Sequence, residues 1–355
     1  MQESPPFLSI ENINVAYDKK PIVRDVSIQL AEGELACLLG PSGCGKTTIL
    51  RSISGFQTLN SGSIKLGGQT LCDNSNGLAP EKRNVGMVFQ DHALFPHLTI
   101  YQNVCFGLKG LNESKQKQRV TDLLNLVGMD EHQNKYPHEL SGGQSQRVAL
   151  ARAIAPQPKL LLMDEPFSNL DTELRESLGY EVRELLKELN MTAIMVTHDQ
   201  HDAFALGDQI GVMSDGELMQ WDSSFNLYHA PNNRFVANFI GDGIFVTGRM
   251  VEDNVVITPF GEVRGQTVNE QLVGQDVDLL LRPDDVIYDM GSSIKGRIIR
   301  KAFKGAQTLY TIESKSGDTL MSLAPSHDDY EIGDQIGLSI NADHLVCFSK
   351  KSKIS

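Results

Sequence analysis

A glycine-rich turn between a predicted buried strand and a predicted helix constrains this 355-residue chain more than any other feature. The preceding run, ELACLLG, is almost continuously apolar, as a strand buried on both faces requires. The turn fits the pattern G-x-x-x-x-G-K-[ST], whose glycines let successive amide groups and the helix N-terminus face phosphate oxygens. We assign to this phosphate site Gly40, Pro41, Ser42, Gly43, Cys44, Gly45, Lys46, Thr47 and Thr48. Lys46 is expected to neutralise β- and γ-phosphate charge, and the Thr47 hydroxyl to bind Mg²⁺.

A second buried strand ends in two consecutive carboxylates. LLLMD, from Leu160 to Asp164, is followed directly by Glu165. Asp164 is suited to hold Mg²⁺, and Glu165 is suited to polarise an attacking water as general base. Buried strands often end in acidic turns, so this pattern gains its weight from its pairing with the phosphate turn.

Length and composition predict two ordinary globular domains in a reducing compartment. The chain is 40% hydrophobic and 22% charged, and it is longer than one typical domain. Its net charge of -13 argues against a nucleic-acid partner, because phosphate backbones select basic surfaces. Five scattered cysteines favour neither a disulfide framework nor a zinc site. Neither a signal peptide nor an apolar run of about 18 residues is visible, so other chains would have to supply any membrane channel.

The order of strand and helix patterns predicts an α/β domain over residues 1–240. FLSIENINVAY and RDVSIQL alternate apolar and polar residues, as half-buried antiparallel strands do. LLLMD and AIMVTHD are instead buried strands that each follow a helical stretch, which indicates a parallel sheet wrapped by helices. Residues 91–150 read as a helical insert, most clearly in KQKQRVTDLLNLVGM. The expected fold is a mixed sheet with an antiparallel β subdomain and this insert.

After about Gly241 the pattern changes to many short strands. FVTGRMV, DVDLLLRP and TLYTIES are typical of them, and Gly, Asn, Asp and Ser turns separate them. Such spacing predicts a small all-β barrel or sandwich over residues 241–355. The boundary is placed near residue 240, where LYHAPNNRFVANFIG contains a Pro-Asn-Asn break.

A third motif identifies the class of phosphate-binding protein. An N-cap serine with a flexible glycine pair would explain a helix start at Leu140-Ser141-Gly142-Gly143-Gln144, but not its coincidence with the other two motifs. The pentapeptide is identical to the signature of ABC ATPases, which residues 7–240 resemble as one ATP-binding domain. The resemblance implies ATP as ligand, with Ser141, Gly142, Gly143 and Gln144 contacting the γ-phosphate bound to the opposite subunit. Two copies would then form a homodimer around two ATP molecules.

Other positions match the same family in order along the chain. They are Tyr17 for adenine stacking, Gln90 in the Q-loop, Asp171 in the D-loop SNLD and the switch histidine His198. The resemblance implies Glu165, His198 and Gln90 as catalytic residues, and Thr47, Gln90 and Asp164 as Mg²⁺ ligands. Taken singly, a tyrosine is usually a core residue, a histidine at a strand end is usually structural, and SNLD could be an ordinary turn. Asn169 stands where alanine is more frequent in the family.

The C-terminal region resembles the OB-like regulatory domain appended to binding-protein-dependent ABC importers. LRPDDVIY, from Leu281 to Tyr288, its spacing to RKAFKGAQTLYTIES and the total length are most similar to ferric iron import ATPases. This implies an ATP-hydrolysing motor subunit, peripheral on the cytoplasmic face of the cell (inner) membrane. Its partners would be integral membrane permeases and, indirectly, a periplasmic or extracellular solute-binding protein. Sugar, polyamine and sulfate cargoes stay open.

Two readings from other classes compete with import. A soluble ABC ATPase of translation or DNA repair usually carries tandem ATP-binding domains or a long coiled-coil insert, and neither is visible. A scaffold that has lost hydrolysis is disfavoured because the motif residues are all present. An exporter with separate permease chains stays open.

Overall fold

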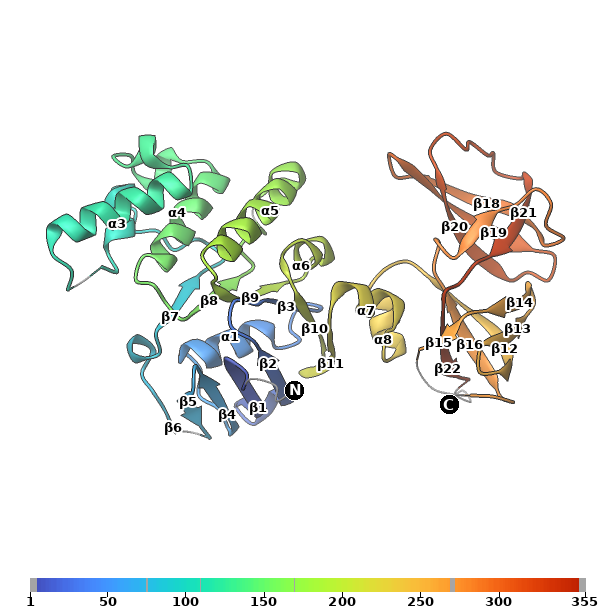
Figure 1. Cartoon of the computed structure of the whole chain (residues 1–355), viewed down its shortest axis with the longest axis horizontal. Coiled ribbons are helices and arrows are strands. Elements are labelled where there is room, and N and C mark those ends of the chain that lie inside the picture. Colours follow the sequence, from blue (N-terminus) through green and yellow to red (C-terminus); the bar gives the residue numbers. More distant parts are fainter. Residues whose placement is uncertain (1–4, 75, 109, 169, 269–271, 351–355) are drawn as a thin grey trace. The chain divides into compact units, whose positions relative to one another are not determined.

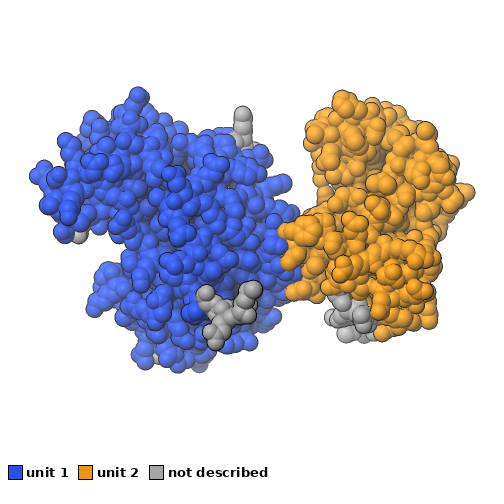
Figure 2. Space-filling view, viewed as in Figure 1, with its two compact units in different colours: residues 1–224 blue, residues 225–355 orange. Residues whose placement is uncertain are grey.

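The computed structural model describes residues 5–350 apart from 75, 109, 169 and 269–271. Asn169, singled out above, lies outside the described residues. The chain divides into two compact units, residues 1–224 and residues 225–355, which are coloured separately in Figure 2. We call them unit 1 and unit 2 and describe each by itself.

Unit 1 contains a five-stranded antiparallel sheet in the order β2-β1-β4-β5-β6. The strands are β1 (Leu8–Tyr17), β2 (Lys20–Leu30), β4 (Ser61–Leu66), β5 (Gln69–Asp73) and β6 (Asn76–Gly77). Tyr17 pairs with Lys20, so Asp18 and Lys19 form a two-residue hairpin turn, both with positive φ as such turns require. The antiparallel subdomain expected from alternating residues is confirmed.

The second sheet of unit 1 has six strands in the order β11-β10-β3-β9-β8-β7. They are β3 (Leu35–Leu39), β7 (Val85–Val88), β8 (Leu160–Asp164), β9 (Thr192–Thr197), β10 (Gln209–Ser214) and β11 (Glu217–Asp222). Neighbouring strands are parallel except for the edge pair β10 and β11. All residues of β3, β8 and β9 are buried, which explains their unbroken apolar sequences.

Helices cover both faces of the parallel sheet. Helix α1 (Lys46–Ser54) lies between the two sheets in Figure 1, where Ile49, Leu50 and Ile53 enter a core shared with both. Helices α5 (Thr172–Glu188) and α6 (Gln200–Leu206) pack together, and α6 covers β3 and β9. Over the part of the chain that is described, no helix has the length and apolarity needed to span a membrane.

The predicted insert is helical. It contains α2 (Ile100–Cys105), α3 (Glu113–Leu126) and α4 (Gly142–Ile154), with single 3-10 turns at Asp130–His132 and Pro137–Glu139; a further such turn, Pro80–Lys82, precedes β7. Side chains cap each helix start, because Thr99, Asn112 and Ser141 accept backbone N–H groups of the first turn. Helix α4 continues beyond residue 150 and packs against β7, which joins the insert to the parallel sheet.

Unit 2 is formed mainly of two sheets, in the orders β14-β13-β12-β16-β22-β15 and β17-β21-β18-β19-β20, whose neighbouring strands are antiparallel except for the edge pair β15 and β22. The elements are α7 (Ser224–His229), α8 (Arg234–Phe239), β12 (Ile244–Glu252), β13 (Val255–Thr258), β14 (Gly261–Arg264), β15 (Gln266–Thr267), β16 (Asp276–Leu281), β17 (Val286–Tyr288), β18 (Lys295–Phe303), β19 (Gln307–Ser314), β20 (Thr319–Pro325), β21 (Gln335–Ile340) and β22 (His344–Ser349). Residues from both sheets share one hydrophobic core. The expectation of an all-β domain after the α/β domain is confirmed.

Arg282, directly after β16, ties the two short helices to the sheets of unit 2. It is 4% exposed, and its Nη1 donates to the backbone carbonyls of Ala237, Gly241 and Asp242 at 3.0, 3.0 and 3.1 Å. Its Nη2 donates to the carbonyl of Tyr228 at 3.2 Å, and the guanidinium lies 4.4 Å from the centroid of that tyrosine ring. The arginine of the LRPDD string therefore anchors the segment 228–242.

This anchoring bears on where the domains divide. By internal contacts α8 belongs to unit 2, although the predicted boundary near residue 240 assigned it to the ATP-binding domain. The reason is visible in Arg282, whose side chain donates to four carbonyl oxygens of residues between 228 and 242. The limits 1–240 and 241–355 stay a prediction about independently folding domains.

Replacing Arg282 is expected to destabilise unit 2. Arg282→Ala leaves buried carbonyls without a donor, so the free energy of unfolding of unit 2 should fall by about 2–3 kcal/mol. Calorimetric unfolding of the full chain would measure this. The control is Arg297→Ala, which removes an exposed pair with Glu313 and should change stability by less than about 0.5 kcal/mol. Equal effects of the two variants would contradict the anchoring role.

Candidate functional site

The glycine-rich turn joins β3 to α1, as its sequence context predicts. A Cβ atom on Gly40 would stand 2.3 Å from the carbonyl oxygen of Met213, so only glycine fits beside β10. Gly45 caps α1 with φ of 105°, and a Cβ there would lie 2.8 Å from the carbonyl oxygen of Ile22. Because neither glycine has a Cβ, the chain can turn tightly around the start of the helix.

Lys46 lies inside the curl of this turn and is only 5% exposed. Its ammonium donates to the carbonyl of Gly40 at 2.7 Å and to that of Pro41 at 3.1 Å. The Cys44 sulfur is 3.7 Å from the same nitrogen, and the Cys44 side chain is buried in the core of unit 1. A hollow of about 350 Å³ opens over the turn, lined by Ile22, Ser42, Gly43, Gly45, Lys46, Thr47, Thr48 and Glu165.

Two oxygen groups from different segments meet beside Lys46. The Thr47 hydroxyl donates to Asp164 Oδ1 at 2.9 Å, which links the first turn of α1 to the end of β8. Burial raises the pKa of the Asp164 carboxyl, and the Thr47 hydrogen bond only partly opposes this shift. A hard divalent cation would stabilise the charged carboxylate, so the hydroxyl and carboxylate pair fits Mg²⁺.

Glu165 and His198 face each other across the ends of β8 and β9. His198 Nδ1 is 3.2 Å from Glu165 Oε2, so the ring and the carboxylate are in direct contact. The Glu165 backbone is unusual for a non-glycine residue, with φ of 45°, and its N–H donates to the carbonyl of Val196 at 3.0 Å. A strained residue held by its neighbours is a feature of functional sites.

Gln90 reaches the same cluster through Ser168. Its Nε2 lies 3.5 Å from Ser168 Oγ, and that hydroxyl donates to the carbonyl oxygen of Glu165 at 3.0 Å. The structure therefore brings together the three predicted catalytic residues, although Gln90 is 75 positions away from Glu165 along the chain. Sequence analysis missed Ser168, because a serine in a turn has no signal of its own.

The remaining predicted residues lie elsewhere in unit 1. Ser141 is exposed and begins α4, where its Oγ accepts the Gln144 N–H at 3.3 Å and the Gln144 side chain accepts the Ser141 N–H at 3.0 Å. Among the described residues lining the hollow, none comes from 141–144, and Tyr17 is also absent. Tyr17 ends β1 and is 41% exposed. Asp171 caps α5 by accepting the Leu174 N–H at 3.0 Å.

Comparisons with known families divide the chain as the fold does. The family described as ABC transporter matches residues 23–168, which include the glycine-rich turn, Gln90, the 141–144 segment and both carboxylates. The family described as TOBE domain matches residues 279–348 in unit 2.

Characterised relatives extend this similarity over nearly the whole chain. The chain is 37% identical over 350 residues to the Fe(3+) ions import ATP-binding protein FbpC of Fusobacterium nucleatum, covering 97% of this chain and 93% of that protein. It is 38% identical over 343 residues to FbpC 2 of Pectobacterium atrosepticum, covering 94% and 98%. The spermidine/putrescine import ATP-binding protein PotA of Thermotoga maritima is 40% identical over 308 residues, covering 85% and 80%.

A solved structure is also similar to this chain. It is cbiO1 from Clostridium perfringens, part of the ABC transporter complex cbiONQ, with a TM-score of 0.58 and 29% identity. The similarity covers 62% of this chain and 89% of that one. The chain belongs to the ATP-binding subunits of ABC importers, the enzymes that couple ATP hydrolysis to transport.

Proposed function

We propose that this subunit hydrolyses ATP at the turn around Lys46 to drive import of ferric iron. The observation that carries the proposal is the convergence of Thr47, Asp164, Glu165 and His198 at one edge of the parallel sheet. A phosphate-binding turn, a cation-holding pair and a general base are the parts that phosphoryl transfer to water needs.

The turn and the start of α1 would hold the triphosphate. Residues 40–48 supply backbone N–H groups and the helix N-terminus, and Lys46 would exchange its contacts with loop carbonyls for contacts with the β- and γ-phosphates. Thr47 and Asp164 would hold Mg²⁺, with Gln90 as a further ligand. When bound, this ion neutralises charge on the phosphates during transfer. Tyr17, exposed at the end of β1, would stack on the adenine.

Glu165 would accept a proton from the attacking water. His198 Nδ1 lies beside the Glu165 carboxylate, so the Nε2 edge of the ring would face a phosphate oxygen. Gln90 is connected to the region around Glu165, because Ser168 links its amide to the Glu165 backbone. Movement of the Q-loop would thereby accompany occupation of the γ-phosphate position.

The second half of each site would come from another copy of the chain. Ser141 is exposed at the N-terminus of the 13-residue helix α4, and its own chain's hollow is lined by other described residues. Such a helix end favours an anion, so residues 141–144 suit the γ-phosphate bound to a partner. A homodimer closed on two ATP molecules would open after hydrolysis and phosphate release.

Iron is the cargo that the relatives favour. Two ferric iron import proteins align with more than nine tenths of this chain, whereas the polyamine import protein aligns with 85% of it. Polyamine import is the alternative, because that relative has the higher identity over its shorter alignment. The subunit would work on the cytoplasmic face of the cell membrane with permeases and, indirectly, a solute-binding protein.

Loss of the general base is expected to separate binding from turnover. Glu165→Gln should lower kcat by about 100-fold or more while ATP still binds, and the closed dimer should accumulate. Steady-state hydrolysis and gel filtration with ATP would measure both effects. The control is Glu184→Gln, an exposed position on α5 that should hydrolyse normally. Normal turnover by the Glu165 variant would remove Glu165 as the base.

A bulky cation at the start of α4 is expected to block the opposite site only. Ser141→Arg should lower hydrolysis about 10-fold or more while monomers bind ATP with unchanged affinity, because the affected phosphate lies across the dimer. Nucleotide titration at low protein concentration would test the second point. The control is Asn112→Arg, which also removes a helix cap, from α3, and should leave hydrolysis intact. Loss of ATP binding by the Ser141 monomer would place Ser141 in its own chain's pocket.

Cargo can be assigned by uptake in cells whose other iron importers have been deleted. Radiolabelled ferric iron should enter iron-starved cells that carry the intact chain and should not enter cells carrying Lys46→Ala, which loses the phosphate-binding cation. Lys65→Ala, which alters a surface pair with Glu11, should support normal uptake. If iron uptake were unchanged by Lys46→Ala while spermidine uptake fell, the cargo would be a polyamine.

A further inference from the structure

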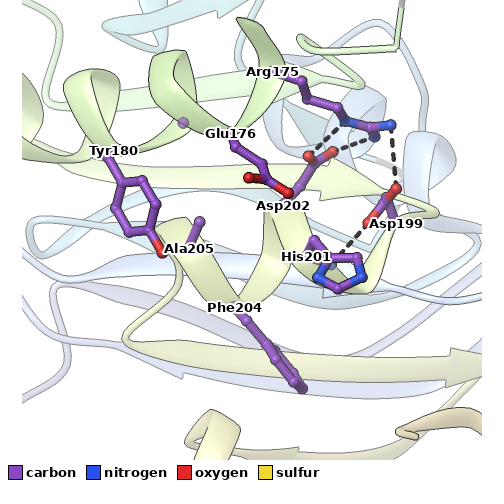
Figure 3. Close-up of a pocket in the computed structure, with 9 residues that line it drawn as sticks. Arg175, Glu176, Tyr180, Asp199, His201, Asp202, Phe204 and Ala205 are labelled. Atoms are coloured by element: carbon purple, nitrogen blue, oxygen red, sulfur yellow. Dashed lines mark hydrogen bonds and ion pairs between the residues drawn. The ribbon is translucent and has the colours of Figure 1, made fainter. Parts of the chain in front are cut away.

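A cluster of charged groups joins helices α5 and α6, as Figure 3 shows, and it includes Asp199, the residue that follows His198. Arg175 on α5 binds Asp202 on α6 with two parallel hydrogen bonds, from Nε to Oδ1 at 2.7 Å and from Nη2 to Oδ2 at 2.5 Å. Its Nη1 lies 3.1 Å from Oδ2 of Asp199, the N-cap residue of α6. One guanidinium therefore fixes two carboxylates in defined positions.

The same network holds both chain neighbours of His198. The Thr197 hydroxyl donates to Asp202 Oδ2 at 2.9 Å, and the Asp199 N–H donates to Thr197 Oγ1 at 3.0 Å. Asp202 is 6% exposed and Thr197 is 2% exposed, so these bonds are largely shielded from water. The side chains on either side of His198 are thus tied to Arg175, that of Asp199 directly and that of Thr197 through Asp202.

Arg175 is also close along the chain to the segment that follows Glu165. It lies in the first turn of α5, and its N–H donates to the carbonyl of Asp171 at 2.9 Å. Helix α5 begins shortly after Glu165, and α6 begins shortly after His198. Arg175 therefore bridges the two segments that bear the Glu165 and His198 pair.

The surroundings show that the bridge is charged and accessible from one side. The Asp202 hydrogen bonds raise the pKa of the Arg175 guanidinium, which is the expected effect of bonding to its charged form. A hollow of about 310 Å³ opens over the network, and Arg175, Glu176, Tyr180, Asp199, His201 and Phe204 are among its lining residues. A shorter side chain at position 175 can therefore be accommodated without a clash.

We propose that Arg175 is a positioning residue for hydrolysis, which holds the His198 turn so that the ring stays in contact with Glu165. Arg175 is absent from the described residues that line the phosphate hollow, so its effect passes through Asp199, Asp202 and Thr197. The inference rests on the proposed roles of Glu165 and His198.

A second arginine on the same helix supplies a matched control. Arg183, two turns further along α5, donates to the carbonyl of Leu206 and to Asp208 Oδ1, the latter at 2.7 Å. It joins α5 to the C-terminal end of α6, away from His198. If both arginines only held the two helices together, replacing Arg175 and replacing Arg183 would have the same effect on hydrolysis.

The first test compares Arg175→Leu with Arg183→Leu in the full-length chain. Misplacing a catalytic group by about 1 Å can cost on the order of 100-fold in rate, so Arg175→Leu should lower kcat about 10-fold or more. The KM for ATP should change less than about twofold, because the phosphate turn is untouched. Arg175→Lys should recover part of the rate, and Arg183→Leu should keep kcat within about twofold. Equal losses of kcat at both positions would overturn the proposal.

A spectroscopic test does not depend on turnover. With ¹⁵N-labelled histidine, the ring signals of His198 can be assigned by their loss in His198→Gln. They should move in Arg175→Leu and stay in place in Arg183→Leu, since only the first variant releases the His198 turn. Unmoved signals in Arg175→Leu would overturn the proposal even if the proposed function holds.

A double-mutant cycle separates the inference from the proposed function. If Arg175 acts through His198, Arg175→Leu should slow hydrolysis little further in a His198→Ala background. A full additional loss there would show that Arg175 acts elsewhere and would overturn the proposal. Normal turnover by His198→Ala alone would instead refute the proposed role of His198. It would also refute the proposal that Arg175 affects the rate through His198.

Discussion

The parallel pairing of β3, β9 and β8 is the constraint on which the site depends. Leu39 pairs with Thr197 and Asp164 pairs with Val196, so the carboxyl ends of three strands stop at one level. Each strand is followed at once by residues of the proposed site, namely the glycine-rich turn, Glu165 and His198. Because the strands are buried on both faces, their register cannot slip without exposing apolar side chains or leaving backbone groups unpaired.

Side-chain hydrogen bonds then connect the segments that the sheet places close together. The Thr47 hydroxyl joins α1 to β8, and Ser168 joins Gln90 to the backbone of Glu165. The Thr47 to Asp164 and Gln90 to Ser168 hydrogen bonds each join segments far apart in sequence, so the site can respond when one segment moves. Arg175 instead restrains movement, because its several charge-assisted bonds hold one turn in place.

Unit 2 is held together by different interactions. Its sheets share an apolar core, and the short helices before them are held by buried Arg282, which donates to four carbonyl oxygens, and by the ion pair of Arg234 with Asp278. The LRPDD string, which first served to identify a resemblance, thus has a structural task in Arg282. The longer string LRPDDVIY also contributed to the expectation of an iron cargo, which whole-chain similarity to two ferric iron import proteins supports.

By itself the sequence determined the fold class and located the candidate phosphate turn, the two carboxylates at the end of β8 and His198, because these signals are local: glycine spacing, apolar runs and residues at strand ends. Only the tertiary structure decided the partners, such as Ser168 for Gln90, Asp199 and Asp202 for Arg175, and the helices for Arg282. Strands such as β15, two residues long, were also beyond prediction, since β15 exists through its pairing with β22. The physical reason is that a hydrogen bond or strand pair depends on the distance between two segments in space, and local residue patterns do not contain that distance.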